Sequence, residues 1–363
     1  MKRIFDFFRN QPPGRLITLG FFLVIMTGAF LLLTPMARRP GVDVSFVDAL
    51  FTSTSAVCVT GLIAIDTYDT FSVFGRAVVA LLIQVGGLGV TSVGAGLILA
   101  AGKKFSFKGR LLIKEGLNVD SFKGVVSLVK SVLLMTFCFE LVGVILSFIV
   151  FVQDYPPLHA LGNSIFHSIA AFNNSGFDVL GGLQNLIPYR DDVLLNLTTC
   201  GLIIFGGIGF LVILVVLRNR FRFRKLALHS KVVISTSIFL IIAGTLILKC
   251  TDDVTWLGAF FHSVSARTAG FSTYPLGTFS NAGLFALTIL MFIGASPGST
   301  GGGIKTSTFF TLVQSMRSAL NKKHFGAFRR SLSKETLSKA YLITLLSLCV
   351  VCTGTFVLCI LEP

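Results

Sequence analysis

The stretch Phe172-Asn173-Asn174-Ser175-Gly176-Phe177 places one glycine in a cluster of small polar residues, directly after an apolar run. Two other clusters have the same character: Ala56-Val57-Cys58-Val59-Thr60-Gly61 and Ala266-Arg267-Thr268-Ala269-Gly270-Phe271. We predict that a short pore helix precedes each cluster, over residues 46–55, 162–171 and 256–265. A unit of about 100 residues that recurs in this way suggests a pore. Backbone carbonyls there would replace the water shell of an ion, and glycine permits the close approach of the backbone.

The composition of the chain is that of an integral membrane protein. Hydrophobic residues make up 53% and charged residues 13% of the 363 residues, and the mean hydropathy is +0.83. An apolar run of about 20 residues spans a hydrocarbon core about 30 Å thick. The predicted membrane segments are residues 16–34, 71–101, 127–152, 193–217, 232–248, 282–313 and 340–361.

The net charge of +15 reflects membrane topology and not nucleic-acid binding. Most lysines and arginines lie in four segments that the positive-inside rule assigns to the cytoplasm. These are Lys2–Arg15, Lys103–Lys130, Arg218–Lys231 and Arg317–Lys339. Most acidic residues fall in the segments on the other side: Asp43, Asp48, Asp66, Asp69, Asp154, Asp178, Asp191, Asp192, Asp252 and Asp253. They form either an acidic vestibule that concentrates cations or ordinary outer loops.

The order of these segments predicts the topology. Two spans separate successive basic segments, so the glycine clusters face outward. The residues between those spans are too apolar for a free loop and too few for two more spans, which favours a re-entrant helix and a return strand. We predict pore repeats over residues 1–115, 116–225 and 226–325, followed by the first span of an incomplete fourth repeat over 326–363. The N-terminal segment lacks a small-residue cleavage site, so we interpret it as an uncleaved helix with a cytoplasmic N-terminus.

The sequence contains no pattern typical of an enzyme. It has no nucleophile–base pair, no cluster of metal ligands and no phosphate-binding glycine loop, so we predict no catalytic residue and no bound cofactor. Cys349 and Cys352 have a CxxC spacing but lie in an apolar span, where we interpret them as core thiols. His167 and His262 recur at matching positions of two repeats, and we expect them to pack or to donate hydrogen bonds in the pore helices.

The segment Gly294-Ala295-Ser296-Pro297-Gly298-Ser299-Thr300-Gly301-Gly302-Gly303-Ile304-Lys305-Thr306 interrupts an apolar span. Proline removes a helix donor and the glycines weaken a helix, so about ten residues should be unwound at membrane depth. We interpret the loop as a gate below the filter, the alternative being a tolerated helix kink. The hydroxyls of Ser296, Ser299 and Thr300 are expected to hold its closed form, with Lys305 as an electrostatic barrier. The predicted gate residues are Gly294, Ser296, Pro297, Gly298, Ser299, Thr300, Gly301, Gly302, Gly303 and Lys305.

Over residues 16–363 the chain resembles the Trk/Ktr/HKT superfamily of potassium transporters. The resemblance lies in the three clusters, in the gate segment, in Thr52–Leu62 and in Gln84-Val85-Gly86-Gly87-Leu88-Gly89. It implies an all-α polytopic membrane protein, with repeated span–pore helix–filter loop–span units around a central cation pore. The family's filter glycines correspond to Gly61, Gly176 and Gly270, and glycine at the first position favours K⁺ over Na⁺. The implied filter residues that bind K⁺ are Val59, Thr60, Gly61, Asn174, Ser175, Gly176, Thr268, Ala269 and Gly270.

The single span before the first filter is similar to the Ktr branch of that superfamily. The resemblance implies a pore subunit of a potassium uptake system in the cell membrane. It also implies a homodimer that sits on a ring of cytoplasmic nucleotide-binding regulatory subunits of the RCK type, with the nucleotide on the partner. The basic segments face the side on which such a ring would bind.

One feature departs from the family pattern. The chain ends at Glu362-Pro363, where the first span of a fourth repeat would end, and we interpret it as a truncated product, the alternative being a shorter protein. Three functions therefore remain open: a cation-conducting subunit, a non-conducting membrane scaffold that assembles with partners, and a secondary carrier. A carrier usually keeps ionisable residues near the midplane, where the candidates are Glu140, Arg267 and Lys305. We expect Arg267 to point away from the pore.

Overall fold

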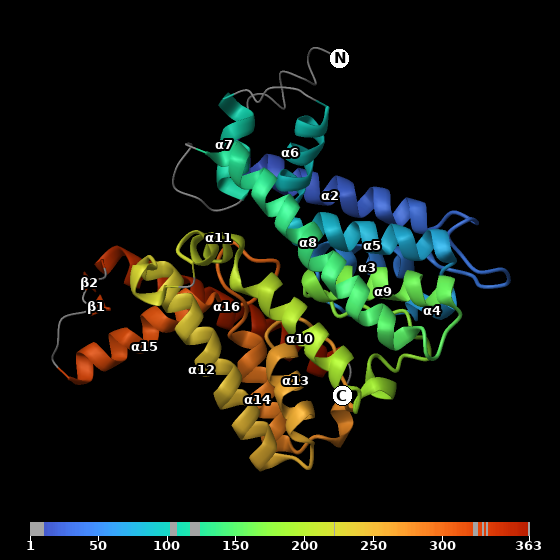
Figure 1. The fold of residues 1–363 in the computed structure, drawn as a ribbon. Helices are drawn as coiled ribbons and strands as arrows, with labels where there is room; N and C mark the ends of the chain where they lie inside the picture. The colour runs from blue at the N-terminus through green and yellow to red at the C-terminus, as the bar shows by residue number, and fades with distance from the viewer. Residues whose placement is uncertain are drawn as a thin grey trace.

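The computed structural model describes residues 11–101, 107–116, 124–220, 222–321, 326–328, 330–331 and 333–361. Those residues form helices and loops, together with one short antiparallel hairpin of β1 (Gly326–Ala327) and β2 (Arg330–Ser331). The predicted all-α membrane fold is confirmed (Figure 1). Several basic residues of the predicted cytoplasmic segments, and Glu362-Pro363, lie outside the described residues.

Four helices are long and apolar enough to cross a membrane in one piece. They are α2 (Pro13–Leu32), α8 (Val125–Phe151), α12 (Leu228–Thr251) and α16 (Lys334–Leu361). Each overlaps a membrane segment predicted from hydropathy. The first three each precede a pore helix, whereas α16 contacts mainly α15 and, among its described residues, buries only Ala340.

Three shorter helices take the positions predicted for pore helices. They are α3 (Phe46–Cys58), α9 (Pro157–Phe172) and α13 (Trp256–Ser265). Their first turns have the expected chemistry: Ser45 and Asp48 form a capping box at α3, Thr255 accepts from the amide of Gly258 at α13, and α9 begins with proline. All three end at a small-polar cluster.

The same contact fixes each pore helix to the span before it. A serine hydroxyl of the pore helix donates to a carbonyl of the span, three residues before a glycine of that span. The bonds are Ser53 Oγ to Ile25 O (2.7 Å), Ser168 Oγ to Glu140 O (2.7 Å) and Ser263 Oγ to Ile241 O (2.8 Å). The glycines are Gly28, Gly143 and Gly244. A Cβ at any of them would collide with the serine, so the absence of a side chain allows the two helices to approach closely.

The spans that follow the first two filters are bent and not straight. Helix α5 (Val73–Leu88) turns by 99° into α6 (Val90–Ala100), and α10 (Val193–Ile208) turns by 95° into α11 (Phe210–Arg218). The apolar runs predicted over 71–101 and 193–217 are therefore each divided into two helices, a bend that was not predicted. Gly89 and Gly209 at the bends have φ of 81° and 97°, which no residue of a right-handed helix can adopt.

The third such span is interrupted in the middle. Helix α14 (Asn281–Phe292) ends, an irregular loop follows, and α15 begins at Thr306 and ends at Leu320. The predicted unwinding of Gly294–Lys305 is confirmed. We call residues 293–305 the covering loop.

Shorter elements connect the spans. They are α4 (Thr67–Thr70), α7 (Phe107–Gly116) and the 3₁₀ turns η1 (Ile187–Tyr189), η2 (Phe223–Lys225) and η3 (Leu276–Thr278). In Figure 1, α7, α11 and α15 lie toward one end of the long helices and α4 lies near the other end. The main core lies between the pore helices and the spans around them, and Phe71, Phe151, Phe172, Phe177 and Phe261 are its largest buried side chains. The repeat boundaries given above stay a prediction.

Candidate ion pathway and covering loop

The three glycine clusters, far apart in sequence, meet backbone to backbone. A Cβ placed on Gly61 would overlap the carbonyl oxygen of Ser175 in the second cluster. A Cβ on Gly176 would lie 2.7 Å from the carbonyl oxygen of Ala269 in the third cluster. We call these three segments the filter loops. Only glycine fits at their contact, because any side chain would push the loops apart.

The backbone of all three filter loops has the same unusual conformation. Each glycine has a positive φ: 74° at Gly61, 73° at Gly176 and 80° at Gly270. The residue two positions earlier is also left-handed in every loop. Its φ is 56° at Val59, 57° at Asn174 and 72° at Thr268. A left-handed residue at every second position turns successive carbonyls toward one side of the chain, whereas carbonyls alternate in a β-strand. Non-glycine residues in this region cost about 1–3 kcal/mol each, and such strain concentrates at functional sites.

Hydroxyl groups where the pore helices meet the filter loops are hydrogen-bonded to nearby groups, and the main-chain carbonyls of the loops are the candidate ligands. The carbonyl of Gly176 also accepts from Nδ2 of Asn185 at 3.2 Å. Thr60 donates to Ser55 Oγ (2.9 Å), and Ser175 donates to the carbonyl of Ala170 (3.1 Å). Ser265 donates to the carbonyl of Phe271 (2.5 Å), just past the third glycine. Because these hydroxyls are already engaged, an ion in the pathway would be coordinated mainly by main-chain oxygens.

A buried polar cluster behind the second filter loop was not predicted from the sequence. The amide nitrogen Nδ2 of Asn173 donates to Gln84 Oε1 at 2.9 Å and to Glu140 Oε1 at 3.2 Å. It also reaches the carbonyl of Ile169 at 2.9 Å. The cluster therefore joins α5, α8 and the second filter loop. The sequence signal was the presence of Gln84 and Glu140, two polar side chains inside otherwise apolar spans.

Arg267, His167 and His262 are largely buried in this region. Arg267 is 8% exposed, and its Nη2 donates to Ser237 Oγ on α12 at 3.3 Å. His167 Nε2 lies 2.8 Å from Thr199 Oγ1, and the His262 ring contacts those of Phe279 and Tyr274. Within the described residues no three His, Cys, Asp or Glu side chains gather to hold a metal ion.

The covering loop is bonded directly to two of the filter loops. Thr300 Oγ1 donates to the carbonyl of Phe172 at 3.1 Å, at the start of the second filter loop. The amide of Gly302 donates to Thr268 Oγ1 of the third filter loop at 3.1 Å. The loop also borders a cavity of about 340 Å³. Its walls include Val59, Thr60, Thr268, Gly270, Gly302 and Gly303.

The break between α10 and α11 supplies further partners for the covering loop. The amides of Ser296 and Thr300 donate to the carbonyls of Gly207 (2.9 Å) and Gly206 (3.2 Å). In return the amide of Phe210 donates to the carbonyl of Gly298 at 2.9 Å. A continuous helix would have used these groups within itself, so the bend at Gly209 makes them available to the loop.

The hydroxyls of the covering loop do not all act as expected. We predicted that Ser296, Ser299 and Thr300 would hold the loop in place, but only the Thr300 hydroxyl reaches a filter loop. Ser299 Oγ donates to the carbonyl of Ser296 (2.6 Å), and Ser296 Oγ pairs with Thr306 Oγ1 (2.9 Å). The half-buried Lys305 donates from Nζ to the carbonyl of Gly301 at 2.7 Å. These three contacts shape the loop from within.

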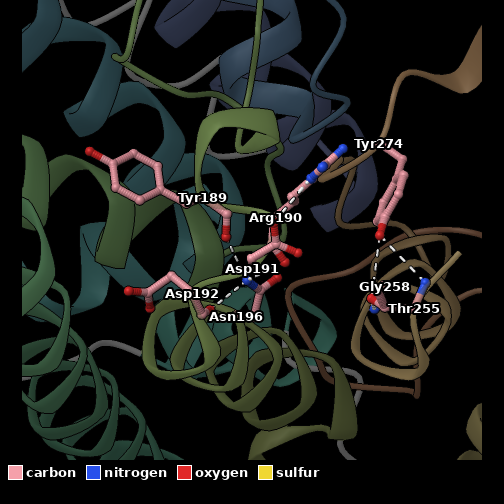
Figure 2. A network of polar contacts seen from close by, with 8 residues as sticks. All are labelled: Tyr189, Arg190, Asp191, Asp192, Asn196, Thr255, Gly258 and Tyr274. Atoms are coloured by element: carbon pink, nitrogen blue, oxygen red, sulfur yellow. Dashed lines mark hydrogen bonds and ion pairs between the residues drawn. The ribbon is translucent and has the colours of Figure 1, made fainter.

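Polar contacts also surround the loop between α9 and α10 and the start of α13 (Figure 2). Asn196 Nδ2 donates to the carbonyls of Tyr189 (2.8 Å) and Asp192 (2.6 Å), and so holds the turn that carries Arg190. The guanidinium of Arg190 lies 5.8 Å from the centre of the Tyr274 ring, whose hydroxyl donates to Thr255 Oγ1 at the start of α13. The two outer segments are thereby fixed relative to each other.

Some of the outer acidic residues hold loops in place, which favours a structural interpretation for them. Asp66 accepts from the amide of Leu183 (2.8 Å), and Asp69 accepts from the amide of Gly182 (3.0 Å). Asp178, two residues past the second filter glycine, is different. Burial raises its pKa to about 6, helped by the nearby charge of Asp66 and opposed by the amide of Leu180. Its charge therefore changes between pH 5 and 7.

Fold and site together define a polytopic helical membrane protein in which three glycine-containing loops, far apart in sequence, meet backbone to backbone. A family model described as a cation transport protein, TrkH, matches residues 21–247 and 231–362. The chain belongs to this family, the Trk/Ktr superfamily, in its Ktr branch. The family is one of transporters and not of enzymes.

Similar proteins span nearly the whole chain. The Ktr system potassium uptake protein B of Bacillus subtilis is 37% identical over 99% of this chain and 82% of its own length. The potassium/sodium uptake protein NtpJ of Enterococcus hirae is 36% identical over 94% of this chain and 78% of its own length. The crystal structure of the potassium transporter TrkH from Vibrio parahaemolyticus is 19% identical and superposes with a TM-score of 0.65, over 88% of this chain and 67% of that one. That similarity shows the fold.

Proposed function

We propose that this chain is the membrane pore subunit of a potassium uptake system. The observation that carries the proposal is the repeated left-handed backbone of the three filter loops, which meet at Gly61, Gly176 and Gly270. A ring of main-chain carbonyls at membrane depth replaces the hydration shell of a monovalent cation without adding a charged side chain that would trap it. Relatives named as potassium uptake proteins support K⁺ as the transported ion.

The finer assignments belong to the same proposal. The carbonyls of residues 59–61, 174–176 and 268–270 bind K⁺, and the covering loop is the gate on the cytoplasmic side of the filter. The gate is closed when Thr300 and Gly302 are bonded to the filter loops. Lys305 places a positive charge next to the pathway in this state, which opposes the passage of cations.

The proposed assembly is a homodimer on a cytoplasmic ring of RCK-type regulatory subunits that bind a nucleotide. The relatives' description as components of a Ktr system supports a partner subunit. The cytoplasmic face carries the N-terminus and the basic ends of α11 and α15, and a movement of α15 by the ring would pull on the covering loop. The chain then lies in the cell membrane and requires no cofactor of its own.

The test is rubidium and potassium uptake by this chain in a host that lacks its own potassium uptake systems. We expect uptake above the empty-vector level, and we expect Gly61→Ser, Gly176→Ser and Gly270→Ser each to lower the preference for K⁺ over Na⁺. Gly277→Ser is the matched control, because a side chain at Gly277 meets open space in η3. Unchanged selectivity in all three filter variants would refute the filter assignment. Normal insertion with no uptake would favour the alternative of a non-conducting scaffold.

A further inference from the structure

An apolar groove runs between α5 and α9. Its volume is about 430 Å³. Val73, Ala77 and Ala80 of α5 form one wall, and Leu161, Ile165 and Phe166 of α9 form the other. Val73 is 73% exposed, and both helices begin at the end that the predicted topology places outside. On that topology the groove opens near the outer surface and extends inward along about two helical turns.

One arginine lines the groove, and a second arginine lies near it. Arg76 lines the groove, and its Nε is buried with no hydrogen-bond partner. Its guanidinium lies 4.8 Å from the centre of the Tyr68 ring, and the guanidinium of Arg39 lies 4.4 Å from the same ring. Among the described residues neither arginine forms a salt bridge. Arg76 is the arginine that lines the groove, and Arg39 lies against the same tyrosine ring. A guanidinium without a carboxylate partner favours a ligand with an anionic group.

A second unpaired donor lies in the same groove. Asn163 of α9 is 2% exposed, lines the groove, and its Nδ2 has no partner. A buried amide without a hydrogen bond is destabilising, so such a donor favours a ligand that brings an acceptor. The groove therefore offers an apolar channel, an uncharged donor in its wall and cationic donors near its outer part.

This combination matches one kind of molecule. We propose that the groove binds an anionic phospholipid of the outer leaflet, with one acyl chain between α5 and α9 and the phosphate beside Arg76 and Arg39. The Asn163 amide then donates to an ester or glycerol oxygen of the lipid. A helix of a second copy of this chain would fill the apolar part but would leave the two arginines unmatched unless it also brought a carboxylate.

The headgroup can be tested by native mass spectrometry of the purified full chain, titrated with phosphatidylglycerol or phosphatidylcholine. We expect phosphatidylglycerol to be retained in preference, and Arg76→Gln to weaken its retention about tenfold, the usual effect of losing one charge-assisted hydrogen bond. Arg76→Lys keeps the charge and should retain most of the binding. Arg190→Gln, a change in an outer arginine that is paired with Asp191, is the control. Equal retention of both lipids, or no effect of Arg76→Gln in a protein that elutes normally, would overturn the proposal.

The groove itself is tested by filling it. A side chain at Gly162 meets nothing within 4 Å, so Gly162→Leu places bulk in the groove without disturbing its walls. Gly201→Leu on α10 is the matched control, since its site is equally open. We expect Gly162→Leu alone to reduce retention of phosphatidylglycerol. If Gly162→Leu instead dissociates a dimer and leaves lipid retention unchanged, the groove is an interface between copies and the proposal is wrong.

Discussion

Replacement of Thr300 by valine isolates the hydrogen bond between the covering loop and the second filter loop. Valine has nearly the same shape as threonine but lacks the hydroxyl that donates to the carbonyl of Phe172 at 3.1 Å. The backbone amide of Thr300 keeps its own bond to Gly206. The change therefore removes one contact of the bonded loop and leaves the fold of the loop itself intact.

The size of the expected effect follows from that single bond. A neutral hydrogen bond contributes about 1 kcal/mol net, and 1.4 kcal/mol corresponds to a factor of ten. The ratio of closed to open loop should therefore fall about fivefold. If the loop is closed most of the time, the initial rate of cation uptake should rise by the same factor. Deletion of residues 298–303 also removes the contacts of Gly298 and Gly302, and should raise the rate further and weaken its dependence on a regulatory partner.

The measurement is the initial rate of rubidium uptake per inserted protein, in cells that lack other potassium uptake systems. Thr288→Val is the control, because the Thr288 hydroxyl bonds only to Leu284 within α14. We expect the control to leave the rate unchanged. If Thr300→Val and the deletion both insert normally and both leave flux and regulation unaltered, the covering loop is not the gate.

Three further predictions concern the filter and its surroundings. Gly206→Ala places a methyl group against the carbonyl of Phe172, so the second filter loop must shift, and uptake should fall well below that of Gly201→Ala at equal expression. Asn173→Ala removes the donor that Gln84 and Glu140 share, and should lower the free energy of unfolding by about 1–3 kcal/mol, measured as a lower melting temperature in detergent. Asp178 has a pKa raised to about 6, so its negative charge is present above that pH and absent below it. Cation uptake at low substrate should accordingly rise between pH 5 and 7, and this rise should be smaller in Asp178→Asn; an identical pH profile would exclude Asp178 as its source.

The order of membrane helices, pore helices and loops along the chain was predictable from the sequence, because hydropathy and charge are properties of whole segments. The straight membrane helices, the pore helices and the unwound segment after Phe292 all follow from apolar runs, capping residues and the Pro297–Gly303 cluster. The bends at Gly89 and Gly209 were missed, because hydropathy contains no information on whether the φ angle of a glycine is positive. The repeated patterns Gly86-Gly87-Leu88-Gly89 and Gly206-Gly207-Ile208-Gly209 were the available signal.

The partners within the site were harder to predict than its location. A sequence shows that Thr300 and Ser299 are polar, but it does not show that one hydroxyl meets Phe172 while the other turns back to Ser296. The same holds for Asn173, whose partners are 89 and 33 residues away in the chain. The filter and gate residues themselves stay predictions until transport is measured.

The reciprocal hydrogen bonds between the covering loop and the α10–α11 break also make the rate of loop opening measurable. The amides of Ser296, Thr300 and Phe210 are all donors in these bonds, and the amide of Gly302 is held by Thr268. A loop that swings aside as one piece must release these four amides together. Their hydrogen exchange with deuterated water should then share one rate, set by the opening motion and different from that of neighbouring helical amides. Opening could be timed in this way without any ion being transported.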